Sequence, residues 1–143
     1  MIKKKIKLYY KNIISKTFEN IHGKVFLKKN TSALLDISQV NDPFFKSYEN
    51  KKYNIYKVKK ARIFTDNNEN VAVIKNNLLI PQLSFQQIKG KLHHAKYNSV
   101  INKGTPSLIK KFPGTVLNLA QGGSVNNYFH FFFDIIPKIY LVQ

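Results

Sequence analysis

The sequence contains no cysteine, no tryptophan and few acidic residues. Without cysteine, neither a disulfide framework nor a cysteine-based zinc site can form, which fits a reducing compartment. Only 7 Asp and Glu stand against 24 Lys and Arg, so the formal net charge is +17. A charge of this size ordinarily suggests nucleic acid as a partner, because clustered Lys and Arg release counterions from phosphates.

The positive charge is spread along the chain and is almost entirely lysine. Arginine, the usual reader of bases and phosphates, is represented by Arg62. Abundant Asn, Ile, Tyr and Phe accompany the lysines, a bias that an AT-rich genome produces without selection for binding. We therefore favour compositional bias over a nucleic-acid surface. A basic module that binds RNA or anionic polysaccharide, supported by the charge and the 13% aromatic content, is the alternative function.

No long apolar run follows the basic N-terminus. Lys7, Lys11 and Lys16 interrupt it, so neither a signal peptide nor a membrane-spanning helix is supported, and we expect a cytoplasmic protein. Residues 1–22 are predicted to form an amphipathic helix. We favour docking of its apolar stripe on the domain; peripheral contact with the anionic inner membrane is the alternative. The stripe consists of Ile6, Tyr9, Tyr10, Ile13, Ile14 and Phe18.

Residues 23–113 are predicted to form a β-rich entry region. Strands are expected near 24–27 and between residues 53 and 80, with a tight hairpin at residues 71–80, because Asn76 and Asn77 tolerate the positive φ that such a turn requires. Pro81 is expected to end that strand. Apolar residues at 85, 88 and 92 suggest one or two helical turns despite Gly90.

His93 and His94 are adjacent, which argues against a shared metal ion. Neighbouring side chains diverge by about 100° on a helix and lie on opposite faces of a strand, so one ion cannot readily take both. No metal site and no cofactor are expected.

Residues 114–143 organise the functional hypothesis. A short apolar run at 115–119 predicts a buried strand, residues 121–127 a polar turn, and residues 128–142 a helix buried almost all round. Strand, glycine-containing turn and helix together form the opening of a βα unit, which places helix N-terminal amides beside a ligand. The candidate substrate-binding residues of this turn are Gly122, Gly123, Ser124, Asn126 and Asn127; helix capping is the structural alternative for the two asparagines.

Three polar residues interrupt the apolar helix at spacings of four. His130, Asp134 and Lys138 therefore share one stripe of the helix. Imidazole has the near-neutral pKa that a general base needs, and a carboxylate one turn away can orient it. From spacing alone, a purely structural His–Asp hydrogen bond is the favoured interpretation. Pro137 is expected to kink the helix, and Lys138 can pair with Asp134.

A family resemblance changes that balance. The signature of glycosyltransferase family 61 reads Asn-Tyr-aromatic-His-aromatic, then an acidic residue, then Pro followed by a basic residue. The chain resembles it at Asn127, Tyr128, Phe129, His130, Phe131, Asp134, Pro137 and Lys138. Phe131 stands where Trp is common and Lys138 where Arg is common. The segments Ala61–Phe64 and Val71–Lys75 also resemble the extended N-terminal segment of bacterial members.

The resemblance implies an inverting, metal-independent transferase of capsular polysaccharide or lipopolysaccharide biosynthesis. It implies a nucleotide-sugar donor, a glycan or polysaccharide acceptor, and an α/β fold of GT-B type with two Rossmann-like domains. Residues 114–143 would begin the first of them, so this fragment is expected to be α+β. His130 is the candidate catalytic base and Asp134 its orienter. The apolar pattern running to residue 143 predicts that the chain continues into a further domain, without which the fragment is expected to be inactive.

Overall fold

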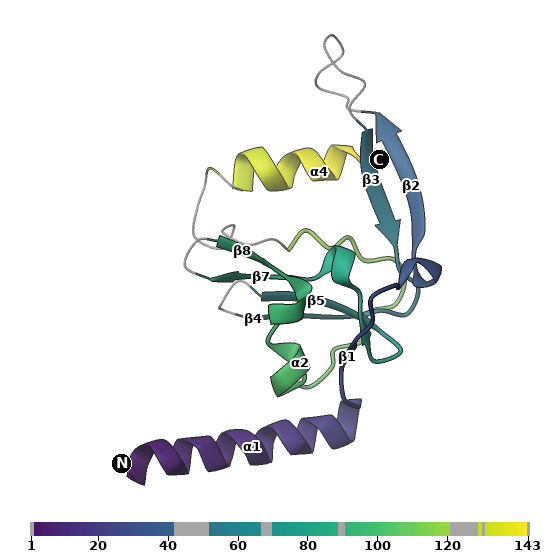
Figure 1. Ribbon diagram of the computed structural model, residues 1–143. Coiled ribbons are helices and arrows are strands. Elements are labelled where there is room, and N and C mark those ends of the chain that lie inside the picture. Colours follow the sequence, from purple (N-terminus) through teal and green to yellow (C-terminus); the bar gives the residue numbers. More distant parts are fainter. Residues whose placement is uncertain are drawn as a thin grey trace.

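A computed structural model describes residues 2–41, 52–66, 70–88, 91–120, 129 and 131–142 of the chain. The fold is mixed α+β. A central sheet lies between helix α1 (Ile2–His22), which projects from one side of the molecule, and helix α4 (Ile136–Tyr140), which lies on the other side (Figure 1). Within the described residues, no helix combines the length and apolar content needed to cross a bilayer.

The sheet is built around strand β5 (Asn70–Lys75). One edge of β5 pairs with the antiparallel strand β4 (Arg62–Asp66), and the other edge is shared by two strands. β5 is therefore covered along both edges. Four further strands complete the sheet among the described residues: β6 (Leu78–Leu79), β7 (Phe85–Ile88), β1 (Phe26–Leu27), parallel to β6, and β8 (Lys91–His94), antiparallel to β7.

β6 and β7 leave a gap along β5 at Val73, and groups outside the ladder fill it. The Oγ atom of Ser84 accepts a hydrogen bond from the Val73 N–H at 3.0 Å. The N–H of Ile80 donates to the Val73 carbonyl at 2.9 Å. Pro81, which has no N–H, opens a 3-10 turn between the two strands and ends β6 as expected. The buried backbone of β5 thus stays hydrogen-bonded where the ladder is interrupted.

The predicted hairpin between β5 and β6 is confirmed. Asn76 has φ 50° and Asn77 has φ 58°, both in the left-handed region that a two-residue turn requires. Asparagine tolerates this region better than most residues. The turn also meets the end of α1, because a Cβ atom on Gly23 would clash with the side-chain amide of Asn77.

The hydrophobic core lies against the sheet on the side of α2 (Val100–Lys103). Its residues come from β5, from β6 and from positions 25, 95 and 100. The core therefore joins the segment that follows α1 to the segment that follows β8. The cluster comprises Val25, Ala72, Ile74, Leu79, Ala95 and Val100, with Phe64 and Ile101 packed against it.

A buried asparagine ties the core helix to two strands. The Nδ2 atom of Asn98 donates to the carbonyls of Val71, at 2.8 Å, and Phe85, at 3.0 Å. Its Oδ1 atom accepts from the N–H of Val100 at 3.2 Å, at the start of α2. The bonds to Val71 and Val100 are buried and the bond to Phe85 is partly buried, so losing this side chain would remove a donor from both carbonyls.

Helix α1 forms as predicted and ends at His22. Gly23 has φ 79°, and its N–H donates to the Glu19 carbonyl at 2.8 Å, which closes the helix. Arg62 Nη1 donates to the His22 carbonyl at 3.1 Å and so places a cation at the negative end of the helix dipole. The guanidinium is half-buried, and burial lowers the pKa of Arg62 from its ordinary value by desolvation.

Strands β2 (Asp36–Asn41) and β3 (Lys52–Lys57) form a separate antiparallel pair. β3 confirms the strand expected from residue 53 onward. In both figures α4 lies beside this pair, on the side of the molecule away from α1. The pair is largely exposed to solvent.

Two expectations from the sequence are wrong. Residues 85–88 and 91–94 form the β7–β8 pair instead of helical turns, with Gln86 opposite His93 in the ladder. Apolar spacing of three and four suggested a helix, but β7 has an open edge of β5 to pair with, at Asn70 and Val71. Residues 115–119 form no strand and are mostly exposed, because no described strand pairs with them.

Candidate functional site

Most of the predicted site lies outside the described residues. This holds for Gly122, Gly123, Ser124, Asn126, Asn127 and His130, and for the side chain of Asp134. The structure does describe the backbone of residues 131–142, and Lys138 with its side chain. The helix that would carry the catalytic pair can therefore be examined, although the pair itself cannot.

That helix changes type along its length. Phe131–Ile135 form a π-helical turn, and α4 follows from Ile136. Pro137 lies in the first turn of α4, where its missing N–H leaves no hydrogen bond unmade. The change from π-helical to α-helical hydrogen bonding lies just before Pro137, and the kink expected there stays a prediction. The backbone of Asp134 lies inside the π turn, a feature that often marks functional positions.

The helix is not buried all round, so that prediction is wrong. Ile135 is its one buried side chain among the described residues, whereas the aromatic residues around it face solvent. Phe129 and Phe133 contact each other with ring centroids 4.6 Å apart, and Phe131 packs edge to face on Phe132 at 5.7 Å. The aromatic rings pack on neighbouring rings of their own helix, and a large apolar surface stays open.

Lys138 is half-buried in α4. Its position four residues after Asp134 keeps both backbones on one side of the helix, as the spacing predicts.

The two adjacent histidines have separate structural roles. His94 Nδ1 accepts a hydrogen bond from the Lys96 N–H at 3.3 Å, and His93 packs edge to face on Tyr97 at 5.6 Å. Their side chains diverge, as expected for neighbours on a strand. In the described part of the chain, no group of three or more His, Asp or Glu is placed to hold a metal ion.

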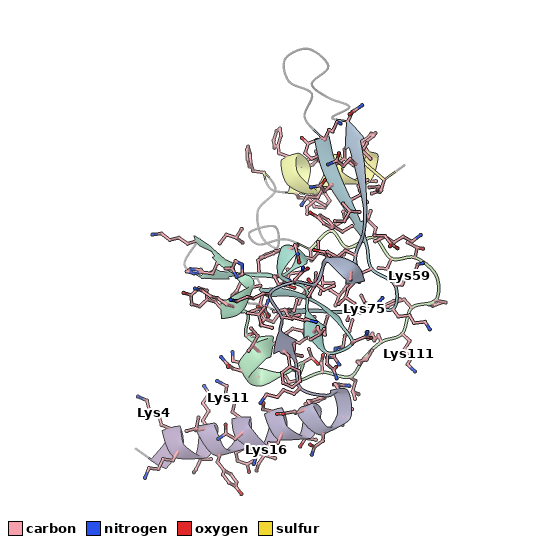
Figure 2. All side chains as sticks on the ribbon, turned by 45° about the vertical axis from the view of Figure 1, so that its right-hand side comes forward. Lys4, Lys11, Lys16, Lys59, Lys75 and Lys111 are labelled. Atoms are coloured by element: carbon pink, nitrogen blue, oxygen red, sulfur yellow. The ribbon has the colours of Figure 1, made fainter. Side chains whose placement is uncertain are left out.

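Lysines are distributed over separate parts of the molecule. Figure 2 shows Lys4, Lys11 and Lys16 on α1, and Lys59, Lys75 and Lys111 on the body of the molecule. Sequence reasoning missed one role for a cation: Arg62 was noted for its rarity and for the family resemblance, and the structure assigns it to the end of α1. The feature of the sequence that could have revealed this role is that Arg62 is the single Arg in a chain rich in Lys.

Comparison of the chain with protein-family models, with curated proteins and with solved structures gave no match. The resemblance to glycosyltransferase family 61 therefore stays a prediction that rests on the residues between Asn127 and Lys138.

Proposed function

We propose that this chain is the N-terminal part of an inverting glycosyltransferase that moves a sugar from a nucleotide-sugar donor to a glycan or polysaccharide hydroxyl. The observation that carries the proposal is the resemblance of residues Asn127 to Lys138 to the family signature. The helical backbone at 131–140 supports it, because the spacing of the signature requires one helix face.

The proposed reaction is a single displacement at the anomeric carbon. The acceptor oxygen forms a bond to that carbon from the face opposite the leaving group, while the bond to the nucleotide phosphate breaks and its electron pair leaves with the phosphate. His130 takes the proton from the acceptor hydroxyl as general base. Asp134 orients the imidazole and stabilises its charged form, and Lys138 supports Asp134.

The remaining predicted residues would shape the acceptor side of the site. Glycines at 122 and 123 permit close approach of backbone to a sugar. Ser124, Asn126 and Asn127 supply hydroxyl and amide groups for hydrogen bonds to sugar oxygens. The exposed aromatic rings of Phe129, Phe131, Phe132 and Phe133 give apolar surface on which sugar rings or a second domain can pack. In this proposal the fold of the complete protein is of the GT-B type, with two Rossmann-like halves around a cleft.

The test uses the complete protein that carries this chain. A panel of nucleotide sugars is incubated with it and with polysaccharide acceptors, and release of free nucleotide and the anomeric configuration of the product are measured. We expect release with one class of donor and an inverted configuration in the product. Release with none of the donors, or retention of configuration, would reject the proposal.

A further inference from the structure

Helix α1 turns its apolar stripe away from the rest of the molecule. Ser15 and His22 face the body: Ser15 Oγ donates to the Lys103 carbonyl at 3.2 Å, and His22 Nε2 donates to the Ser107 carbonyl at 3.0 Å. Leu8 lies seven residues before Ser15 and hence on the same side of the helix. Ile6 and Tyr10 stand two residues from Leu8, about 200° around the axis, so they point the opposite way.

The stripe on that opposite side is open to solvent. Docking on the domain, the favoured expectation, is limited to the C-terminal end of the helix, where Phe18 is half-buried and stacks on His22 at 5.7 Å. The remaining stripe residues keep large exposed fractions: Ile6 51%, Tyr9 68%, Tyr10 63%, Ile13 45% and Ile14 47%.

Lysines border this stripe on both sides. Lys5 and Lys16 lie one turn from Tyr9 and Ile13 along one border, and Lys7 lies one turn from Tyr10 along the other. Figure 2 shows Lys4 and Lys11 on the side of α1 nearer the sheet. The helix holds six lysines and one acidic residue, Glu19. An apolar stripe with lysines along both borders matches a bilayer surface, which has an apolar interior and anionic headgroups.

We propose that α1 lies flat on the surface of an anionic lipid bilayer. Ile6, Ile13 and Ile14 enter the acyl boundary, Tyr9 and Tyr10 occupy the headgroup level, and the bordering lysines reach lipid phosphates. A helix is about 10 Å across, so even the lysines on its upper side stay within about one Debye length of the headgroups.

Charge also argues against a second copy of the chain as the occupant of the stripe. Two α1 helices packed by their stripes would bring the bordering lysines of both copies, Lys5, Lys7 and Lys16, close together. Like charges at that distance oppose association. The inference does not depend on the proposed transferase activity, because it rests on α1 alone.

The experiment measures partition of this chain onto vesicles by co-sedimentation. Vesicles of phosphatidylcholine alone are compared with mixed vesicles of phosphatidylcholine and phosphatidylglycerol, with Ile6→Ser as the stripe variant and Leu8→Ser as its matched control. Leu8 is exposed to a similar extent, at 59%, but lies on the other side of the helix. Circular dichroism and a thermal melt verify that both variants fold like the parent.

We expect strong partition onto the mixed vesicles, weak partition onto phosphatidylcholine, and weakening with added salt. Ile6→Ser should lower the partition coefficient about tenfold and Leu8→Ser less than about twofold. Equal partition onto both vesicle types, or equal effects of the two variants, would overturn the proposal. A dimer in sedimentation equilibrium that Ile6→Ser dissociates would also overturn it and assign the stripe to a second copy.

Discussion

Strand β5 and the C-terminal stretch from residue 106 to residue 142 are both rich in apolar residues, yet they are covered to opposite degrees. Every residue of β5 from Asn70 to Ile74 is buried, because β4 lies on one edge, β6 and β7 share the other, and the core packs on Ala72 and Ile74. Among the described residues of the C-terminal stretch, most large apolar side chains are exposed. Apolar composition alone therefore does not decide burial; partners for the backbone and for the side chains do.

The apolar side chains around β5 form a core, whereas those of the C-terminal stretch form an exposed surface. The β5 region forms a closed unit in which the buried side chains of Ser84 and Asn98 are hydrogen-bonded to backbone groups of the strands. The C-terminal stretch exposes Leu108, Phe112 and Phe133, and exposed apolar area of this extent is typical of surfaces that meet another domain, a partner or a ligand. In the proposed transferase, the second Rossmann-like domain would pack on that surface.

The largest effect should come from deleting the same side chain in each region. Leu79 is fully buried at 0% exposure, and Leu108 is 82% exposed. Leu79→Ala should lower the free energy of unfolding by about 3 kcal/mol, because it leaves a cavity in the core. Leu108→Ala should change it by less than about 0.5 kcal/mol. Urea denaturation measures both, and equal losses would break the distinction between the regions.

A smaller effect is expected at the buried asparagine of the closed unit. Asn98→Ala leaves the carbonyls of Val71 and Phe85 without donors and should cost about 2 kcal/mol in the free energy of unfolding. The exposed Asn102, in the short helix α2 that follows Asn98, is the control, and Asn102→Ala should cost less than about 0.5 kcal/mol. A loss at Asn98 no greater than at Asn102 would show that the network contributes little.

The smallest effect concerns the turn that closes β5 on β6. Asn76 is exposed with φ 50°, so Asn76→Val introduces a β-branched residue into the left-handed region and should cost about 1 kcal/mol. Asn76→Gly keeps that conformation accessible and should be close to neutral. Thermal unfolding of the two variants distinguishes backbone strain from loss of the side chain, since both remove the amide. Equal melting temperatures would count against strain.

Sequence reasoning recovered the elements whose causes are local. The amphipathic spacing of residues 4–20 specified α1, and the Asn76–Asn77 pair specified a hairpin through its tolerance of positive φ. The mixed α+β class expected for this fragment agrees with the structure. The boundaries of α1 and of the hairpin agree closely with the structure because capping and turn chemistry act within a few residues.

The expectations that proved wrong depend on distant partners. Phe85 carries the same apolar signal on a strand or a helix, and only the free edge of β5 at Val71 decides for a strand. Val116 and Leu117 have the composition of a buried strand, but no described strand pairs with them. Burial of Phe131–Phe133 was predicted because the helix is apolar on nearly every side. In the structure these three rings are exposed, and no described element packs over them. The candidate catalytic pair came from the family resemblance, which neither spacing nor the described structure tests.

The most direct test of the sugar-transfer account is the turnover of the complete protein carrying His130→Ala, measured beside His93→Ala, with the free energy of unfolding of each. His93 packs on Tyr97 away from the signature and serves as the control. The account predicts a loss of about a hundredfold or more for His130→Ala at unchanged stability, and a parental rate for His93→Ala. A parental rate for His130→Ala would contradict the assignment of His130 as the general base.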